Sequence, residues 1–367
     1  MTKIFIPAIS GDTDSILLLT SLESRGHSAI RWVGDNYPSV DVSSFFISNE
    51  EPTIGYVKSP YLELHTEDID VVWLRRPRWP VLPKEVHPDD REIAEQECRQ
   101  YIRSFYQASW LKAVWVNTLE GRRKANSKLL QLREAARIGL RIPQTVISNE
   151  PNVIRKFIEQ NVGNVIVKAL IGNAWKEDDG QRFCYTADIN CSQLPSDNLI
   201  QACPAIYQKK IQKSSEVRAV FFGAEAIAIE LDSQSSRSAS LDWRIDPYTF
   251  SSRLIQIPEN IYDMCRQLMR CLGILHGSFD FAIDTTGNWV FFEVNEAGQF
   301  LWMEDFVPET QILEIATQFF AAPDWNFRAT KNPNHLTIAN MIETTRFREL
   351  RDADMQNETS ANATASI

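Results

Sequence analysis

The chain has 367 residues, of which 44% are hydrophobic and 23% charged, as in an ordinary globular protein of two or three domains. Its formal net charge of -10 argues against nonspecific binding to nucleic acid or to an anionic membrane surface. The sequence shows no signal peptide, no membrane-spanning run, and no CxxC pair or Cys/His cluster with zinc spacing. We therefore expect a cytoplasmic protein with reduced thiols.

The N-terminal third of the chain predicts a parallel α/β layer. A strand, a helix and a second strand follow one another, and Gly26 stands where the helix should end. A third strand, DVVWLRRP, stops at Pro77, and Pro88 begins a long amphipathic helix before a last strand, VWVN. We expect an N-terminal α/β domain over residues 1–118, with its first three elements at 3–8, 13–24 and 28–33.

From residue 119 onward the order of the predicted elements changes. Strands come in consecutive runs with helices between the runs, which is typical of an α+β unit with antiparallel sheets. The predicted helices lie at 122–138, 151–160 and 258–273, and the predicted strands at 145–149, 164–170, 205–211, 216–222, 224–231, 277–284 and 289–295. We divide this part into a central subdomain, a C-terminal subdomain with the metal site, and a polar tail expected to be partly disordered, at 119–203, 204–325 and 326–367.

One apolar strand, WVFFEVNEAG at 289–298, carries two oxygen-bearing side chains in its middle. Glu293 and Asn295 point to the same face because side chains alternate along a strand. A turn at 285–288 joins this strand to FDFAID and can bring Asp280 beside them. Three oxygen donors suit a hard cation such as Mg²⁺, because an isolated buried carboxylate is costly. The alternative is a strand that runs out into a polar turn.

Positive side chains near the ends of apolar elements offer partners for phosphate oxygens. Lys168 shares a strand face with Ile166, and Lys128 lies in the helix KANSKLLQLREAARIG. Farther on, Glu216 and Arg218 share one face of a later strand. A lysine binds phosphate as a point charge, although each lysine alone also fits a solvated surface position. The ordered set of cations and oxygen donors predicts a site for Mg²⁺ and a nucleotide.

These residues stand in motifs that resemble those of the ATP-grasp carboxylate–amine/alcohol ligases. In chain order the motifs are KANSKLLQLREAARIGLRIPQT, VIVKA, YQKKI, EVRAVFFG, DWR at 242–244, FDFAID and FFEVNEAGQFLWMED. The chain is most similar to the graspetide (microviridin-type) macrocyclase branch, through VWLRRPRWP at 72–80 and DSQSS before DWR. The resemblance covers residues 1–325. It implies an ATP-grasp fold, α/β and α+β, with an N-terminal parallel α/β (pre-ATP-grasp) domain.

The resemblance also implies that ATP and Mg²⁺ are bound, and it gives a role to each position that matches a motif. Lys128 and Lys168 would contact the phosphates, and Glu216 would lie near the ribose. The adenine would be held by the main chain of Gln208, Lys209, Lys210 and Ile211. The residues that would stabilise charge on the phosphoryl group and the acyl-phosphate are Arg218 and Arg244, and those that would hold Mg²⁺ are Asp280, Glu293 and Asn295. Many ATP-grasp ligases have a glycine-rich loop over the phosphates, whereas this chain has IGNAWKEDDGQRF at 171–183.

The activity that the resemblance implies is ATP-dependent ring closure in a ribosomal precursor peptide. Asp or Glu side chains would be activated as acyl-phosphates and joined to Ser/Thr hydroxyls or Lys amines, which gives macrolactones or macrolactams. Such chemistry needs no enzyme nucleophile, and the chain has no GxSxG or HExxH motif. Two alternatives stay open: a ligase that adds an amino acid or amine to a small molecule or protein tail, and a non-catalytic nucleotide-binding module. No nucleic acid or membrane partner is expected, and a homodimer is left open.

Two further hypotheses concern segments outside the predicted site. The first is that residues 171–192, which are acidic and contain Trp175, Phe183 and Tyr185, help to hold the leader part of the precursor. The alternative is a mobile surface loop with solvated charges. The second is that the basic end of the strand at Arg75-Arg76-Pro77 faces the cleft, against the alternative of an exposed basic turn.

Overall fold

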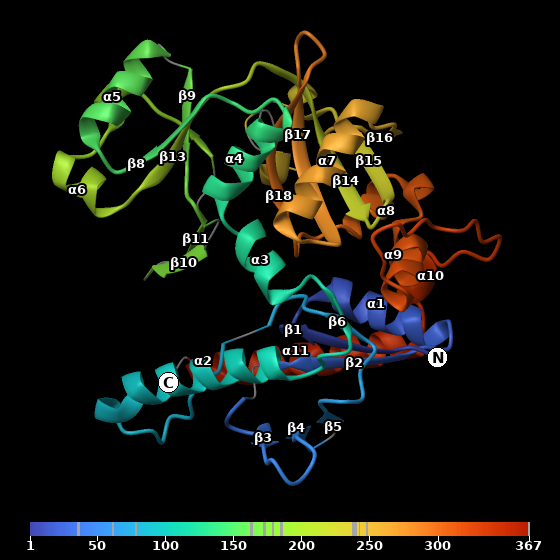
Figure 1. Ribbon diagram of the computed structural model, residues 1–367. Helices are drawn as coiled ribbons and strands as arrows, with labels where there is room; N and C mark the ends of the chain where they lie inside the picture. The colour runs from blue at the N-terminus through green and yellow to red at the C-terminus, as the bar shows by residue number, and fades with distance from the viewer. Residues whose placement is uncertain are drawn as a thin grey trace.

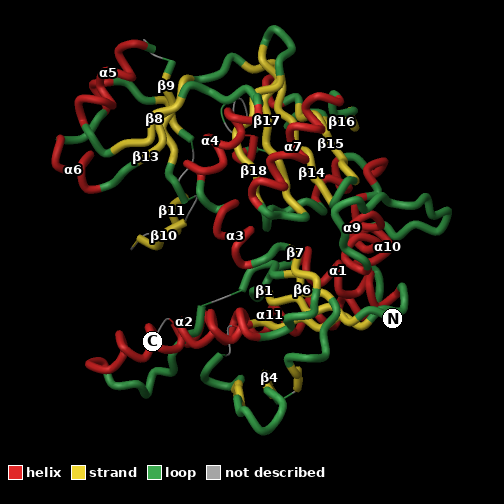
Figure 2. Tube along the Cα trace, in the orientation of Figure 1, coloured by secondary structure: helices red, strands yellow, loops and turns green. Residues whose placement is uncertain are grey.

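The structure, a computed structural model, describes residues 1–367 apart from 35–36, 61, 78, 162–163, 172–173, 178–179, 184–185, 237–240, 242, 247–248 and 366–367, and apart from the side chains of 174–177, 180–183, 244 and 356–365. Figure 1 shows three main parts, each built around its own sheet. Figure 2 shows that the helices α3 (Leu119–Ala125) and α4 (Lys128–Ile138) run from the N-terminal part to the two other sheets.

The N-terminal part is a four-stranded parallel sheet in the order β2-β1-β6-β7, as the sequence predicted. Its strands are β1 (Lys3–Ala8), β2 (Ser28–Val33), β6 (Val71–Trp73) and β7 (Val114–Val116). Because side chains alternate along a strand, Ile4 and Ile6 of β1 pack with α1 on one face, whereas Phe5 packs with α2 on the other. The two covering helices are α1 (Thr13–Ser24) and α2 (Arg91–Ala108).

A small antiparallel sheet between β2 and β6 was not predicted. It comprises β3 (Val42–Phe46), β4 (Ile54–Ser59) and β5 (Leu62–His65). Val57 and Leu64 are its buried apolar side chains, and they join the core under α2. Its strands are short and lack long apolar runs, so local pattern gave no signal for them.

The predicted helix at 122–138 is two helices in the structure, α3 (Leu119–Ala125) and α4 (Lys128–Ile138). The break falls at Asn126 and Ser127, and the Ser127 hydroxyl caps α4 by accepting a hydrogen bond from the Leu130 amide at 3.3 Å. Serine and asparagine favour such cap positions over helix interiors because their side chains bond nearby backbone. The new start places Lys128 at the first position of α4.

The second sheet, which we call the small sheet, has the antiparallel order β12-β9-β13-β8. A core cluster of six buried residues joins it to α5 (Pro151–Gln160) and α6 (Asp197–Ala202) on one face. The predicted subdomain boundary between 203 and 204 would separate β13 from the sheet in which it pairs. The strands are β8 (Thr145–Ser148), β9 (Val165–Lys168), β12 (Ala187–Asp188) and β13 (Ala205–Lys209), and a separate hairpin is formed by β10 (Ala174–Glu177) and β11 (Gly180–Phe183).

The third sheet, which we call the large sheet, has the antiparallel order β16-β15-β14-β17-β18. One face packs on α4 and α7, and the other face shares a core with α1 and α9. The N-terminal part and the large sheet therefore share buried apolar residues. The elements are β14 (Lys213–Phe222), β15 (Glu225–Leu231), β16 (Ser252–Ile255), α7 (Glu259–Leu272), β17 (His276–Asp284) and β18 (Trp289–Asn295), of which β16 was not predicted.

The C-terminal segment begins with α8 (Trp302–Phe306) and α9 (Ile312–Ala321), and the predicted polar tail at 326–367 contains α10 (Ile338–Ile342) and α11 (Thr345–Ala365). The helices α9, α10 and α11 all contact α1. Partial disorder of the tail stays a prediction. Asp354 of α11 is buried and accepts two hydrogen bonds from Arg31, at 2.7 and 2.8 Å. No helix in the described part of the chain is long and apolar enough to cross a bilayer.

Candidate active site

The strand pair β17–β18 places the three predicted metal ligands on one face. Asp280 lies opposite Glu293 in the strand register, and Asn295 lies opposite Ser278. The Asn295 amide Nδ2 donates to Glu293 Oε1 at 2.9 Å and to Asp280 Oδ2 at 3.3 Å. The hairpin that the sequence predicted therefore brings these three side chains into contact.

Lys128 reaches the same cluster from the first position of α4. Its Nζ lies 2.6 Å from Glu293 Oε2 and 3.5 Å from Asn295 Oδ1. The helix is held against β18 by Gln131, whose side chain donates to the Val294 carbonyl at 2.9 Å and accepts from the Val294 amide at 3.0 Å. Gln131 was missed in the sequence, although its place three residues after Lys128, on the same helical face, was the available signal.

Arg218 comes from β14, the neighbour of β17, where it lies opposite Asp280. Its Nη1 donates to Asp280 Oδ1 at 2.7 Å, and its Nη2 donates to the Gln299 carbonyl at 2.8 Å. The side chain is buried, so the guanidinium is held in one place by a carboxylate and a backbone acceptor. This contact connects the predicted phosphate cation to the predicted metal ligands.

Lys168 approaches the cluster from the end of β9 in the small sheet. Its Nζ lies 5.3 Å from the centre of the Phe292 ring, next to Glu293 in sequence. Burial by itself raises the pKa of the Glu293 carboxyl, but the charge of Lys128, the hydrogen bonds of Lys128 and Asn295, and the charge of Lys168 together hold that pKa well below its usual range. Glu293 is therefore ionised at neutral pH.

The predicted adenine segment begins at the end of β13, where Gln208 is buried and donates to Thr145 Oγ1 at 2.9 Å. The amides of the next two residues already bond to backbone, Lys209 to the Gln144 carbonyl and Lys210 to the Asn164 carbonyl. The Lys210 ammonium pairs with Asp188 at 2.8 Å. None of these contacts reaches the Asp280–Glu293 cluster, so the nucleotide role of residues 208–211 stays a prediction.

Glu216, the residue predicted near the ribose, is buried and accepts hydrogen bonds from two side chains that the sequence did not single out. These are Lys213 Nζ at 2.8 Å and Ser233 Oγ at 3.0 Å. Lys213 also donates to the Leu241 carbonyl at 3.1 Å. Arg244 lies in a 3₁₀ helix, Trp243–Ile245, but its side chain is outside the described part of the chain, as are most side chains of the proposed leader-binding segment 171–192.

The alternative that the strand end at Arg75 is an exposed basic turn is wrong for Arg75 itself. Its side chain is 0% exposed and lies between the carboxylates of Asp12 and Asp14, each at 3.1 Å. A charge pair between residues about sixty positions apart leaves no trace in local sequence pattern. Arg76 is partly exposed, with Asp12 at 3.9 Å.

The side chains present fit a Mg²⁺–triphosphate. The cluster supplies two carboxylates and one amide oxygen, and no group of three or more His, Cys, Asp or Glu that could hold a metal is found in the residues that the structure describes. Mg²⁺ is usually held by one or two carboxylates together with substrate phosphates, so an incomplete protein shell is the expected arrangement. Three cations, Lys128, Lys168 and Arg218, stand against the two carboxylates, and this formal excess of positive charge suits a polyanion.

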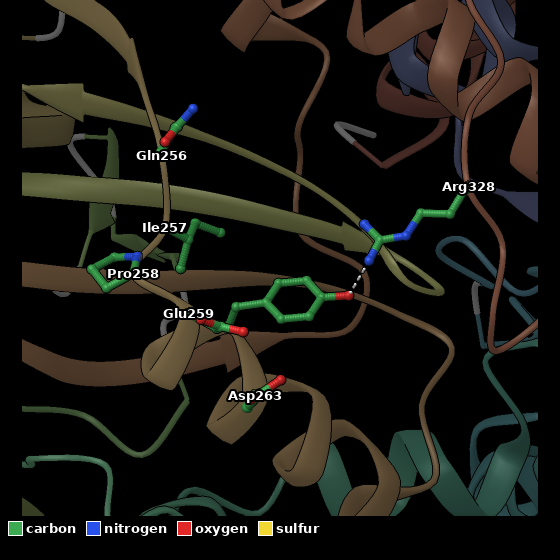
Figure 3. Close-up of a pocket in the computed structure, with 7 residues that line it drawn as sticks. Gln256, Ile257, Pro258, Glu259, Asp263 and Arg328 are labelled. Carbon is green, nitrogen blue, oxygen red and sulfur yellow. Dashed lines mark hydrogen bonds between the residues drawn. The ribbon is translucent and has the colours of Figure 1, made fainter.

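A surface hollow of about 670 Å³ lies elsewhere, between the end of β16 and the start of α7. Figure 3 shows Arg328 reaching across it toward α7, where it donates to the hydroxyl of Tyr262 at 3.0 Å. No residue of the predicted nucleotide site lines this hollow. We therefore place the candidate active site at the Asp280–Glu293 cluster, where charged groups converge, and not at the hollow.

Comparison with known proteins bears on the fold. Residues 3–123 match the family described as the MvdD pre-ATP grasp domain. A RiPP-associated ATP-grasp ligase of Chryseobacterium gregarium, solved in complex with ADP and a leader and core peptide, is 27% identical, with a TM-score of 0.80 over 90% of this chain and 100% of its own. No curated protein matches the sequence.

Two further solved structures are similar. The macrocyclase MdnB of Microcystis aeruginosa is 25% identical, with a TM-score of 0.73 over 88% of this chain and 99% of its own. The ATP-grasp ligase PsnB, solved with a variant of its minimal precursor, Mg and ADP, is 17% identical, with a TM-score of 0.66 over 88% of this chain and 98% of its own. The predicted fold, an ATP-grasp unit behind an α/β pre-ATP-grasp domain, is confirmed.

Proposed function

Because the chain is an ATP-grasp ligase of the graspetide (microviridin-type) macrocyclase branch, we propose that it closes rings in a ribosomal precursor peptide at the expense of ATP. The single observation that carries the proposal is the Lys128–Glu293–Asn295–Asp280–Arg218 cluster, in which every member contacts another. A non-catalytic module would have no need to keep this complete set. A cytoplasmic location and a homodimer stay predictions.

In the first step an Asp or Glu carboxylate of the peptide attacks the γ-phosphorus of ATP. The bond from that phosphorus to the β–γ bridging oxygen breaks, ADP leaves, and an acyl-phosphate remains. When bound, Mg²⁺ would be held by Asp280, Glu293 and Asn295 and would neutralise charge on the phosphates. Lys128 and Arg218, fixed beside those residues, donate to the oxygens on which charge accumulates.

In the second step a Ser/Thr hydroxyl or Lys amine of the same peptide attacks the acyl carbon. Inorganic phosphate leaves and the nucleophile releases a proton, so the peptide loses one water per ring. No side chain of the cluster has to form a covalent bond. The protein contributes positioning and electrostatic stabilisation, which suits a site built of paired charges that are buried or partly buried.

The test is a reaction of the purified protein with ATP, Mg²⁺ and the short peptide encoded beside its gene. We expect ADP to form and the peptide mass to fall in steps of one water, read by mass spectrometry. ADP formation with an unchanged peptide mass, together with attachment of a free amino acid or amine to another acceptor, would establish the alternative ligase. No ADP with any peptide and no nucleotide binding would reject the proposal.

A further inference from the structure

The strand that carries Glu293 and Asn295 ends in a turn that is held from the N-terminal domain. This turn, residues 295–299, is closed by a hydrogen bond from the Gly298 amide to the Asn295 carbonyl at 3.3 Å. Its last residue, Gln299, supplies the carbonyl that accepts from Arg218. The conformation of the turn therefore sets the position of the predicted metal ligand Asn295 and of the Gln299 carbonyl that holds Arg218.

Arg75 of the N-terminal domain contacts the turn directly. Its Nη1 donates to the carbonyls of Ala297 and of Gly298, the second at 3.1 Å. The other nitrogens of the guanidinium are used by Asp12 and Asp14, all at 3.1 Å. A guanidinium presents its donors in a rigid planar fork. The buried side chain of Arg75 therefore connects Asp12, just before α1, and Asp14, in the first turn of α1, to two carbonyls of the 295–299 turn.

Two further hydrogen bonds connect the N-terminal domain to the turn and to the residue after it. Asp14 Oδ2, besides accepting from Arg75, accepts from the amide of Phe300, the residue after the turn, at 3.4 Å. At the other side of the turn, Asn117 donates to the Glu296 carbonyl at 3.2 Å. The N-terminal domain is thus hydrogen-bonded to both ends of the turn. No described contact of Arg75 reaches Asp280 or Glu293 themselves.

From this geometry we infer that Arg75 is a positioning residue for the metal and phosphate site, acting through the 295–299 turn. The inference rests on the proposed function for the identity of the site that is positioned. It makes the N-terminal domain part of the catalytic apparatus, because the guanidinium of Arg75 holds the turn that contains Asn295 and the Gln299 carbonyl, which accepts from Arg218. Partners that orient metal ligands from outside the ligand shell typically change metal affinity or activity about 10–100-fold when removed.

The test compares Arg75→Lys with a matched control, Arg25→Lys. Lysine keeps the charge at position 75 but cannot span two carboxylates and two carbonyls. Arg25 also joins the N-terminal domain to a later part of the chain, through Glu314 at 2.7 Å and the Asn334 carbonyl at 2.7 Å, but it does not contact the turn. Both variants therefore weaken a partly or fully buried arginine contact, and only one of them should loosen the site.

Two readouts separate positioning from general stability. In the metal-free and nucleotide-free protein, amide hydrogen exchange at residues 296–300 should be faster in Arg75→Lys than in wild type and unchanged in Arg25→Lys. The Mg²⁺ concentration for half-maximal binding of a fluorescent ADP analogue should rise about tenfold in Arg75→Lys only. Wild-type exchange and a wild-type Mg²⁺ requirement in Arg75→Lys, or equal changes in the control, would overturn the inference.

If Arg75→Lys does not fold, the variant Asp14→Asn tests the inference in its place. This variant keeps the guanidinium and Asp12 but weakens both the contact to Arg75 and the contact to the Phe300 amide, so a smaller rise in the Mg²⁺ requirement, about threefold, is expected. A folded Asp14→Asn protein with the wild-type requirement contradicts the inference. A wild-type protein that binds no nucleotide with Mg²⁺ would instead count against the proposed function, because these measurements need no peptide.

Discussion

The two sheets that flank the candidate site differ in how firmly they are built. The large sheet is packed on both faces, and one of its cores is continuous with the N-terminal domain. The small sheet packs on α5 and α6 through a cluster of six buried residues on one face. By the alternation of side chains, its opposite face carries Lys168, Ile206 and Gln208, and Lys168 lies near Phe292 of the large sheet.

The difference teaches which half of the site is fixed and which half can move. Asp280, Glu293, Asn295, Lys128 and Arg218 all belong to the large sheet or to the helix packed on it, and they hold one another by hydrogen bonds. The small sheet contributes Lys168, and the core of this sheet is smaller. Because segments with fewer buried contacts open at a lower free-energy cost, we expect the small sheet to move when nucleotide enters, and the large sheet to stay as it is.

The largest expected effect comes from breaking the fixed half at Glu293. In Glu293→Gln the carboxylate that meets Lys128 is lost, and a neutral amide is a poor Mg²⁺ ligand, so ADP formation should fall at least about a thousandfold. The rate of ADP release with peptide present is the measurement. Glu230→Gln is the matched control, because Glu230 also pairs with an arginine, Arg253, on the large sheet but away from the cluster.

The fold of Glu293→Gln should stay intact, since an amide of the same shape can still accept from Lys128. A thermal unfolding midpoint close to that of wild type would show this. Near wild-type turnover in Glu293→Gln would mean that the metal assignment is wrong.

The next largest effect tests the movable half. In Lys168→Met the side chain keeps its unbranched apolar stem but loses the ammonium, so the phosphates lose one cation and kcat/KM for ATP should fall about a hundredfold. If the small sheet closes over bound nucleotide, much of this loss should appear as a higher KM. Lys156→Met, an exposed lysine on α5 of the same part of the molecule, is the control and should behave as wild type. A Lys168→Met enzyme with wild-type KM and kcat would remove Lys168 from the site.

The hairpin at the centre of the fixed half was predictable because two local signals agree there. The alternation FFEVN puts Glu293 and Asn295 on one face, and the turn before it is sharp, with Gly287 at a φ of +83° and the Asp284 carboxylate bonded to the amides of Thr286 and Asn288. Strand β17 therefore folds back beside β18 with Phe281 opposite Phe291, and an irregularity between Phe281 and Asp280, which the sequence did not predict, then brings Glu293 opposite Asp280.

What the sequence did not predict depends on contacts between distant residues. The burial of Arg75 needs Asp12, Asp14 and the carbonyls of a turn more than two hundred residues later. The break between α3 and α4 depends on one serine cap, and the packing of α11 on α1 depends on the Arg31–Asp354 pair. Charge and composition made the C-terminal segment resemble a solvated tail, although one aspartate in it is buried.

A smaller effect is expected at Gly298, which sharpens the picture of a tightly packed fixed half. A Cβ at this position would lie 2.7 Å from Arg218 Nη2 and 3.0 Å from Ser278 Cβ. The guanidinium cannot swing aside without losing Asp280 or the Gln299 carbonyl, so kcat in Gly298→Ala should fall about tenfold. Gly287→Ala strains a turn of the same hairpin where no atom lies within 4 Å, and it should lower stability without lowering kcat. Equal kcat values for the two variants would contradict the packing argument.

The smallest effect concerns the stability of the region around α9, whose core is shared with the large sheet that carries the fixed half. Glu314 of α9 is buried and accepts from Arg25, Gln318 and Asn332 and from the Leu336 amide. Burial by itself raises the pKa of this carboxyl, but the hydrogen bonds outweigh it and lower the pKa from 4.5 to about 2. A carboxyl whose folded pKa is depressed stabilises the fold above its unfolded pKa, and this contribution is lost as pH falls from about 4.5 toward 2.

Glu314→Gln should therefore lower the free energy of unfolding by about 1 kcal/mol at pH 7, and the difference from wild type should shrink as the pH falls below about 4.5. Urea unfolding at several pH values measures it, with the exposed pair Glu343–Arg348 as control through Glu343→Gln. Hydrogen exchange in the small sheet should not change, because the hydrogen-bond partners of Glu314 in the described part of the chain belong to the N-terminal domain and the C-terminal segment. A loss that does not vary with pH would show that packing, and not the ionised carboxylate, accounts for the contribution of Glu314; faster exchange in the small sheet would show that the two halves unfold together.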